Sequence, residues 1–189
     1  MASELPPESV PILLVPAILI PSDLESGPVV PVATPPPKVV KLAQTVIIDR
    51  SCETVFGYRS LLSNGPEWRR GVVSASLEGT GPICVGSHCT EVRSGKEDAT
   101  EQWDLEVTEY EPARLLGIVE RNGGVEVQEV HRFVREGSGT RYTVAVEVTG
   151  GSITAAAFQK LLLENVLQLK WAIEASSGSG PWNMRRQLR

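Results

Sequence analysis

His131 and Glu129 are the side chains of this sequence whose types and spacing are best suited to moving protons. They stand two residues apart in a run over 125–135 that alternates like a strand, so both are expected on one face. A histidine with a pKa near neutrality exchanges protons at pH 7, and a neighbouring carboxylate can orient it. The pair predicts a general acid–base site if this face lines a cavity. A lone histidine in a strand can also be a satisfied structural residue, and that alternative stays open.

The same period of two predicts which other side chains face such a cavity. Trp103, Leu105 and Val107 alternate with polar residues and are taken as inward, which carries Glu101 inward too. We select candidates for substrate contact by three criteria. Strand parity selects Cys89, Glu91, Glu101, Trp103 and Tyr142, the aromatic position after the short helices is Trp68, and the apolar face of the last helix carries Phe158 and Leu162. His88 is set aside because its parity is opposite to that of Cys89.

The sequence contains no motif typical of a metal-binding or cofactor-binding site. Cys52, Cys84 and Cys89 are odd in number and form no CxxC pair, and the sequence holds only 2 histidines, so no metal ligand set is predicted. No GxSxG, Gly-rich phosphate loop or HExxH pattern is present, and no cofactor is expected. Unpaired cysteines are typical of a reducing compartment, which predicts a cytoplasmic protein.

The charge and composition of the chain limit the kinds of partner that it can bind. The 189 residues carry a formal net charge of −5, with 41% hydrophobic and 22% charged residues, which is ordinary for a globular domain. An acidic body without a basic stripe argues against a nucleic-acid partner. The order of strands and one long helix predicts a hollow between sheet and helix, so the expected partner is a hydrophobic small molecule, and a homodimer remains open.

The elements that must position these residues follow a clear order along the chain. A first strand is expected over 39–48, then a short helix after Ser51 and a second helical turn near 59–63, with 67–70 leading into the next strand. Further strands are expected over 72–78, 85–93, 100–109, 114–121, 125–135 and 142–148. A helix capped by Ser152 or Thr154 then continues to about Ala175, with apolar residues repeating every three to four positions.

The ends of the chain differ from this middle part. Ten of the 14 prolines fall within residues 1–37. The apolar run from Val10 to Ile20 is too short to span a membrane and is interrupted by Pro11 and Pro16. We interpret 1–38 as a Pro-rich apolar extension, either a lid or strap, a low-complexity segment or a partner-docking segment. Residues 39–175 form the domain, and 176–189 form a flexible basic tail.

Several short motifs in 44–174 are similar to those of the START-like, birch-pollen-allergen-like superfamily known as SRPBCC, and within it to the polyketide cyclase/dehydratase group. The matching segments are Ser51–Phe56, Trp68, Val85–Ser87, Thr108–Leu115, Phe133 with Gly139–Thr143, and Leu169–Glu174. These motifs are turns, caps and packing positions, so they are specific for fold and weak for activity.

The resemblance implies an α+β helix-grip fold. A curved antiparallel sheet of about seven strands would wrap around the long C-terminal helix, with two short helices after the first strand and an apolar cavity between sheet and helix. It also implies a cofactor-independent enzyme of natural-product biosynthesis that steers an intramolecular cyclisation by shape and general acid–base help. The alternatives are a non-catalytic carrier of a lipid, quinone or pigment, and an interaction module of the chaperone-activator type.

Overall fold

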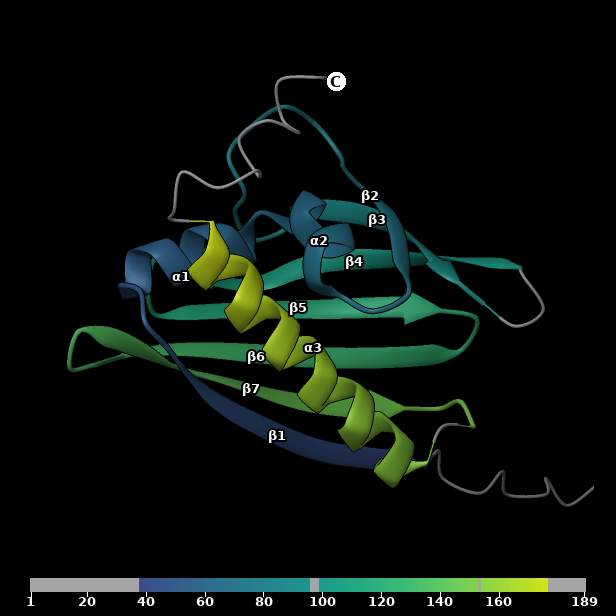
Figure 1. Cartoon of the computed structure of the whole chain (residues 1–189). Coiled ribbons are helices and arrows are strands. Elements are labelled where there is room, and N and C mark those ends of the chain that lie inside the picture. The colour runs from purple at the N-terminus through teal and green to yellow at the C-terminus, as the bar shows by residue number, and fades with distance from the viewer. Residues whose placement is uncertain (1–37, 96–98, 153, 177–189) are drawn as a thin grey trace, which may run out of the picture. The chain divides into compact units, whose positions relative to one another are not determined.

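Seven strands form one antiparallel sheet in the computed structural model, and the helices lie on one face of it (Figure 1). The structure describes residues 38–95, 99–152 and 154–176. Except for Lys38 and Ser176, the extension predicted over 1–38 and the tail predicted over 176–189 lie outside the described residues, and their roles stay predictions.

The order of strands across the sheet is β1-β7-β6-β5-β4-β3-β2, so the first strand lies beside the last one. The strands are β1 (Val39–Ile48), β2 (Val72–Leu77), β3 (His88–Ser94), β4 (Thr100–Glu111), β5 (Leu115–Asn122), β6 (Val125–Glu136) and β7 (Gly139–Thr149). Every neighbouring pair is antiparallel. The expected alternation is clearest in β7, where Tyr142, Val144, Val146 and Val148 are all buried.

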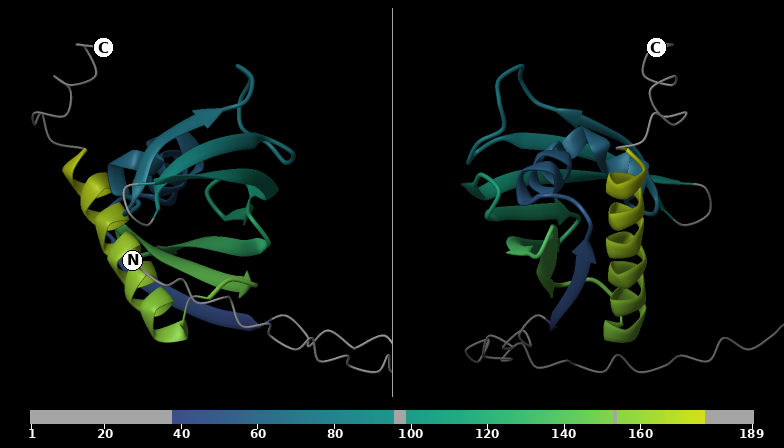
Figure 2. Two further views of the ribbon diagram at one scale, coloured as in Figure 1. Left: turned by 90° about the vertical axis from the view of Figure 1, so that its right-hand side faces the viewer. Right: turned by 60° about the vertical axis from the view of Figure 1, so that its left-hand side comes forward.

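The long helix α3 (Ala155–Ala175) begins at Thr154, whose hydroxyl accepts a hydrogen bond from the Ala157 backbone N–H at 3.2 Å. Its buried side chains, Leu162, Val166, Leu169 and Ile173, repeat at helical spacing and face the sheet. Each buried side chain of this size stabilises the fold by about 1.5–3 kcal/mol. The two views in Figure 2 show α3 running along the concave side of the sheet.

Three short helical segments connect β1 to β2, and they are α1 (Cys52–Ser60), the 3₁₀ turn η1 (Leu62–Asn64) and α2 (Gly65–Trp68). Ser51 caps α1 by accepting a hydrogen bond from the Thr54 N–H. The sequence interpretation was wrong at Glu67 and Trp68, which belong to α2 rather than to the segment leading into β2. Pro66 explains the difference, because its fixed φ favours the first turn of a helix.

The start of β3 is a second correction, because the strand predicted from Val85 begins only at His88. The residues before it form a turn in which the Ser87 N–H donates to the Cys84 carbonyl at 3.0 Å. Gly86 adopts a φ of 83°, which glycine reaches without strain. The predicted order of strands, short helices and long helix is otherwise confirmed, and with it the α+β sheet wrapped around a helix.

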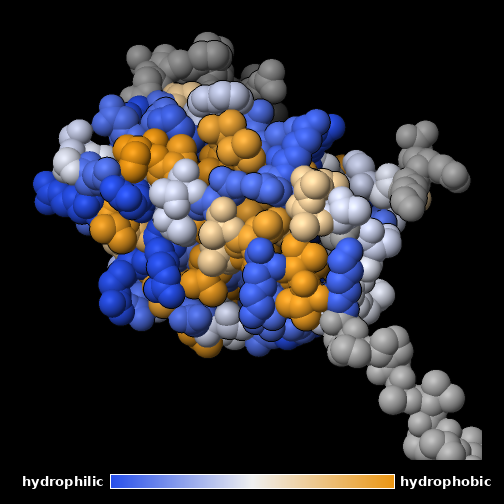
Figure 3. Space-filling model, turned by 90° about the horizontal axis from the view of Figure 1, so that it is seen from below, coloured by the Kyte–Doolittle hydropathy of each residue, from blue (hydrophilic) through white to orange (hydrophobic). Residues whose placement is uncertain are grey.

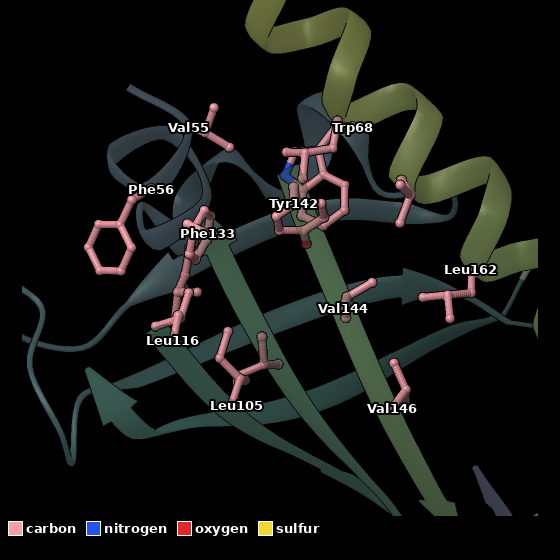
Figure 4. Close-up of a cluster of buried hydrophobic side chains, with 14 of the residues drawn as sticks. Val55, Phe56, Trp68, Leu105, Leu116, Phe133, Tyr142, Val144, Val146 and Leu162 are labelled. Atoms are coloured by element: carbon pink, nitrogen blue, oxygen red, sulfur yellow. The ribbon is translucent and has the colours of Figure 1, made fainter. Parts of the chain in front are cut away.

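Packing between α3 and the sheet forms a continuous core. In the close-up of Figure 4, Leu162 projects from α3 toward the strand that carries Val144 and Val146. Aromatic rings close the other end, where Phe56 meets Phe133 edge to face at a centroid distance of 5.2 Å.

The face of the molecule seen from below Figure 1 carries both hydrophobic and hydrophilic residues. Figure 3 shows apolar residues on this face separated by hydrophilic ones. In the described part of the chain, no helix has both the length and the apolar character needed to cross a membrane.

Candidate functional site

A cavity of about 440 Å³ lies between the sheet and α3. One part of its wall is apolar, and these residues include Val72, Val125, Val127, Val148, Phe158, Leu161 and Leu162. The other part is charged and polar, and these residues include Arg69, Arg70, Arg93, Glu101, Glu120, Glu129 and Asn165. Trp103 belongs to the lining as well. The cavity lining is therefore more polar than the apolar cavity that the sequence led us to expect.

Six side chains form a cluster of charges, called here the Arg–Glu network, and they are Arg59, Arg69, Arg93, Glu91, Glu120 and Glu129. Arg69 is its centre, with N···O distances of 2.7 Å to Glu120 and 3.4 Å to both Glu91 and Glu129. Burial alone would lower the pKa of Arg69, but the three carboxylates outweigh it and raise that pKa well above its usual value.

Chain geometry explains how the network assembles. Glu91 faces inward from β3 and lies close to Gly65 in α2, where an added Cβ would be 2.7 Å from Glu91 Oε1. A glycine therefore makes room for the carboxylate. Trp68 packs under two of the cations, with its ring 5.1 Å from the guanidinium carbon of Arg59 and 5.7 Å from that of Arg69.

His131 is buried beside the network, with 1% of its surface exposed. Its Nε2 lies 2.8 Å from Arg59 Nη2, and its Nδ1 lies 2.8 Å from the Tyr142 hydroxyl oxygen. Because a guanidinium only donates hydrogen bonds, we assign Nε2 as the acceptor and Nδ1–H as the donor to Tyr142. Burial and the nearby Arg59 lower the pKa of His131 to about 4, so the ring is neutral at pH 7.

Glu129 connects His131 to the cavity. Its Oε2 is 3.0 Å from Arg59 Nη2 and 3.1 Å from His131 Nε2. Burial alone would raise the pKa of Glu129, but Arg69, His131 and Arg59 together hold it well below its usual range. The carboxylate therefore stays ionised and is a weak base at neutral pH.

The predicted site residues divide into two groups. Glu101, Trp103, Glu129, Phe158 and Leu162 line the cavity. A second set is buried in the core or the network but is absent from the cavity lining, namely Trp68, Cys89, Glu91, His131 and Tyr142. His88 is exposed, as its parity predicted.

Two of these buried groups have altered acidities. Burial raises the pKa of the Tyr142 hydroxyl to about 12. Burial, helped by Glu91, raises the pKa of the Cys89 thiol to about 11. Neither group is therefore ionised at neutral pH.

Sequence reasoning missed four charged residues of the site, which are Arg59, Arg69, Arg93 and Glu120. Strand parity was a usable signal for two of them. Arg93 shares the parity of Glu91 in β3, and Glu120 shares that of the buried Leu116 and Ile118 in β5. Arg59 and Arg69 carry no comparable signal, because one lies in a short helix and the other in a loop.

Within the described ranges, no group of three or more His, Cys, Asp or Glu side chains is arranged to hold a metal ion. What the site offers instead is a set of fixed N–H donors and carboxylates beside an apolar wall. Such an arrangement suits a ligand with an apolar body and a polar end.

Comparison with known proteins gives both a family and a fold. The family model described as polyketide cyclase / dehydrase and lipid transport matches residues 39–174. No curated protein sequence matches the chain significantly.

Solved structures resemble this one at low sequence identity. An uncharacterised protein from Rhizobium leguminosarum superposes with a TM-score of 0.62 at 12% identity, over 74% of this chain and 97% of that one. A START superfamily protein from Mycobacterium smegmatis gives 0.57 at 14% identity, over 72% and 95%. The di-domain ARO/CYC BexL from the BE-7585A biosynthetic pathway gives 0.57 at 14% identity, over 76% of this chain and 51% of BexL. At these identities the likeness establishes the fold alone.

Proposed function

This chain belongs to the polyketide cyclase/dehydrase and lipid transport family, and we propose that it is a carrier that holds an apolar small molecule between the sheet and α3. The cavity of about 440 Å³, with an aliphatic patch in its wall, is the observation that supports this proposal. The three cysteines, all free thiols, support a cytoplasmic location.

The protonation states of His131 and Glu129 favour a carrier function over acid–base catalysis. A general base works best with a pKa near the working pH. His131 has a pKa of about 4, and the pKa of Glu129 lies well below its usual range. Both groups are also engaged by Arg59, so neither is free to accept a proton readily.

Binding can be tested with N-phenylnaphthylamine, a neutral probe that becomes fluorescent in an apolar cavity. Val127→Phe should fill part of the cavity and weaken probe binding about tenfold or more, because Val127 is buried in the lining. Val134→Phe is the matched control, since Val134 is 55% exposed on the same strand. Equal probe binding by both variants, or none by the wild-type protein, would reject the carrier function.

A cyclase is the second candidate, and the position of Glu129 favours it. Glu129 lines the cavity and also touches His131, so a proton could pass from a bound substrate toward the ring. The cavity would then contribute shape and exclusion of water, and the fixed arginines would stabilise negative charge on an enolate oxygen.

The cyclase can be separated from the carrier by a simple proton-transfer assay. Acetylnaphthalene exchanges deuterium slowly at the carbon beside its carbonyl, and a cyclase should accelerate that exchange. His131→Phe should then lower the exchange rate about a hundredfold and leave N-phenylnaphthylamine binding almost unchanged. Exchange at the uncatalysed rate with the wild-type protein would exclude the acid–base role of His131 and leave the carrier function standing.

A further inference from the structure

Three large apolar side chains form a line on the outer side of α3, called here the outer stripe. They are Leu163, Leu167 and Trp171, and they stand four residues apart, so they share one face of the helix. Leu163 is 45% exposed and Trp171 is 55% exposed, whereas Leu169, on the opposite side of the helix, is fully buried. Figures 1 and 2 show α3 at the edge of the described domain, with no other described strand or helix over this side. An exposed apolar line of this kind is typical of an interaction surface.

Four charged side chains flank the outer stripe, two lysines and two glutamates. Lys160, Glu164, Lys170 and Glu174 all lie within about 60° of the centre of the stripe around the helix axis. Lys160 is exposed. Glu164 pairs with Arg70, and Lys170 pairs with Glu174, yet these three side chains of α3 keep 26–34% of their surface exposed. The flanks of the stripe therefore have no net charge and do not repel a second copy, although the chain as a whole carries −5.

These charges are arranged symmetrically about Leu167, with opposite signs at equal distances. Lys160 stands seven residues before Leu167 and Glu174 seven residues after it, while Glu164 stands three before it and Lys170 three after it. If two copies of α3 lie antiparallel and cross at Leu167, Lys160 meets the partner's Glu174, and Glu164 meets the partner's Lys170. A two-fold axis repeats each of these contacts, so all four charges of each helix face an opposite charge.

The apolar residues follow the same symmetry. Leu163 and Trp171 stand four residues before and after Leu167, so Leu163 meets the partner's Trp171, and the two Leu167 side chains meet on the axis. We propose that the outer stripe of α3 is a homodimer interface, in which a second copy of this chain packs antiparallel and crosses at Leu167. This interface does not depend on the cavity or on its ligand.

The flanking charges favour a second copy over other partners. A membrane surface attracts helices whose polar face is rich in lysine and arginine, and Glu164 and Glu174 oppose such binding. Ile47 of β1 extends the apolar surface beside the stripe, because it is 43% exposed and its carbonyl accepts a hydrogen bond from Lys170 Nζ at 2.8 Å. One helix and part of one strand form a small interface, so the association should be weak, with a Kd on the order of 10 µM.

Sedimentation equilibrium of the whole chain tests the interface. Trp171→Glu should raise the Kd of the dimer about a hundredfold, because it places a charge in the apolar contact on both sides of the axis. Val134→Glu is the matched control, since Val134 is also 55% exposed but lies on β6, and it should dimerise like the wild type. A wild-type protein that is monomeric at about 100 µM would overturn the proposal, whether the stripe is then bare or covered by another segment or another protein. Equal dimerisation of the two variants would overturn it as well.

Lys160→Glu tests the charge pairing. It places a glutamate opposite the partner's Glu174 twice in each dimer, so it should raise the Kd about tenfold at low salt and less at high salt. Lys160→Gln removes the attraction without adding repulsion and should have a smaller effect. A Lys160→Glu variant that dimerises as tightly as the wild type would contradict the antiparallel arrangement.

Disulfide cross-linking tests the crossing point, with Cys84→Ser as the background because Cys84 is exposed. Leu167→Cys should form a covalent dimer on mild oxidation, because the two copies of this residue meet on the axis. Leu163→Cys is the matched control on the same face. Its two copies would lie about 12 Å apart along the helices, which is too far for a disulfide. Equal cross-linking of both variants, or none by Leu167→Cys, would overturn the proposal.

Discussion

Arg69 contacts three buried or nearly buried carboxylates, and this ties the stability of the domain to a single side chain. Buried ion pairs gain little over an apolar replacement of the whole cluster, but removing one partner leaves the others uncompensated. The asymmetry is strong here because Arg69 is the only residue that reaches Glu91, Glu120 and Glu129 together in the described part of the chain.

Replacing Arg69 should therefore be costly. Arg69→Met is expected to lower the free energy of unfolding by about 3–5 kcal/mol, because three carboxylates lose their shared cation. Arg121→Met is the control, since Arg121 forms two exposed ion pairs, and it should cost about 1 kcal/mol or less. Urea denaturation of both variants measures the difference. If Arg69→Met costs no more than Arg121→Met, the network does not stabilise the fold.

Elements were the part of the structure that the sequence predicted well. Alternating apolar residues identified the strands and a helical stripe identified α3, because burial of one face imposes these periods directly. The errors lie at Glu67–Trp68 and Val85–Ser87, where a proline-started helical turn and a tight turn, rather than hydrophobic periodicity, determine the local structure. The network was missed for a different reason: its residues come from α1, the α2–β2 loop and three strands, so only the register brings them together.

A bulge in β4 shows how such register is fixed. The pairing of β4 with β5 shifts between Val107 and Glu109, opposite Gly117. A Cβ added to Gly117 would lie 2.8 Å from Thr108 Oγ1 and 2.9 Å from Glu109 Cβ. The strands approach each other so closely here that only glycine fits.

Gly117→Ala should consequently destabilise the sheet by about 1–3 kcal/mol. Gly57→Ala offers a control of opposite sign, because Gly57 lies within α1 with nothing within 4 Å of an added Cβ. That change should stabilise the protein by about 0.5–1 kcal/mol, as alanine favours a helix more than glycine does. Thermal or urea unfolding of the two variants compares them, and a neutral Gly117→Ala would show that the bulge tolerates a side chain.

For the molecule as a whole, the network joins helices to strands and makes folding sensitive to acid. His131 has a pKa of about 4 in the folded state and about 6.5 when unfolded, so the unfolded state binds its proton first as the pH falls. The stability that His131 contributes is complete above pH 6.5 and is lost toward pH 4. Glu129, whose pKa is also lowered, adds a loss only below about pH 4.5.

Measurements at pH 7 and pH 5 therefore isolate His131. The wild-type protein should lose about 2 kcal/mol more of its free energy of unfolding between these two values than His131→Gln does. Glutamine keeps an acceptor for Arg59 but does not titrate, so the variant should show a flatter profile even if it is less stable throughout. His88→Gln is the control, because His88 is exposed, and it should follow the wild-type profile. If the free energy of unfolding depends on pH in the same way in the wild type and in His131→Gln, the folded structure does not hold His131 neutral. A protonated His131 could not accept the hydrogen bond from Arg59.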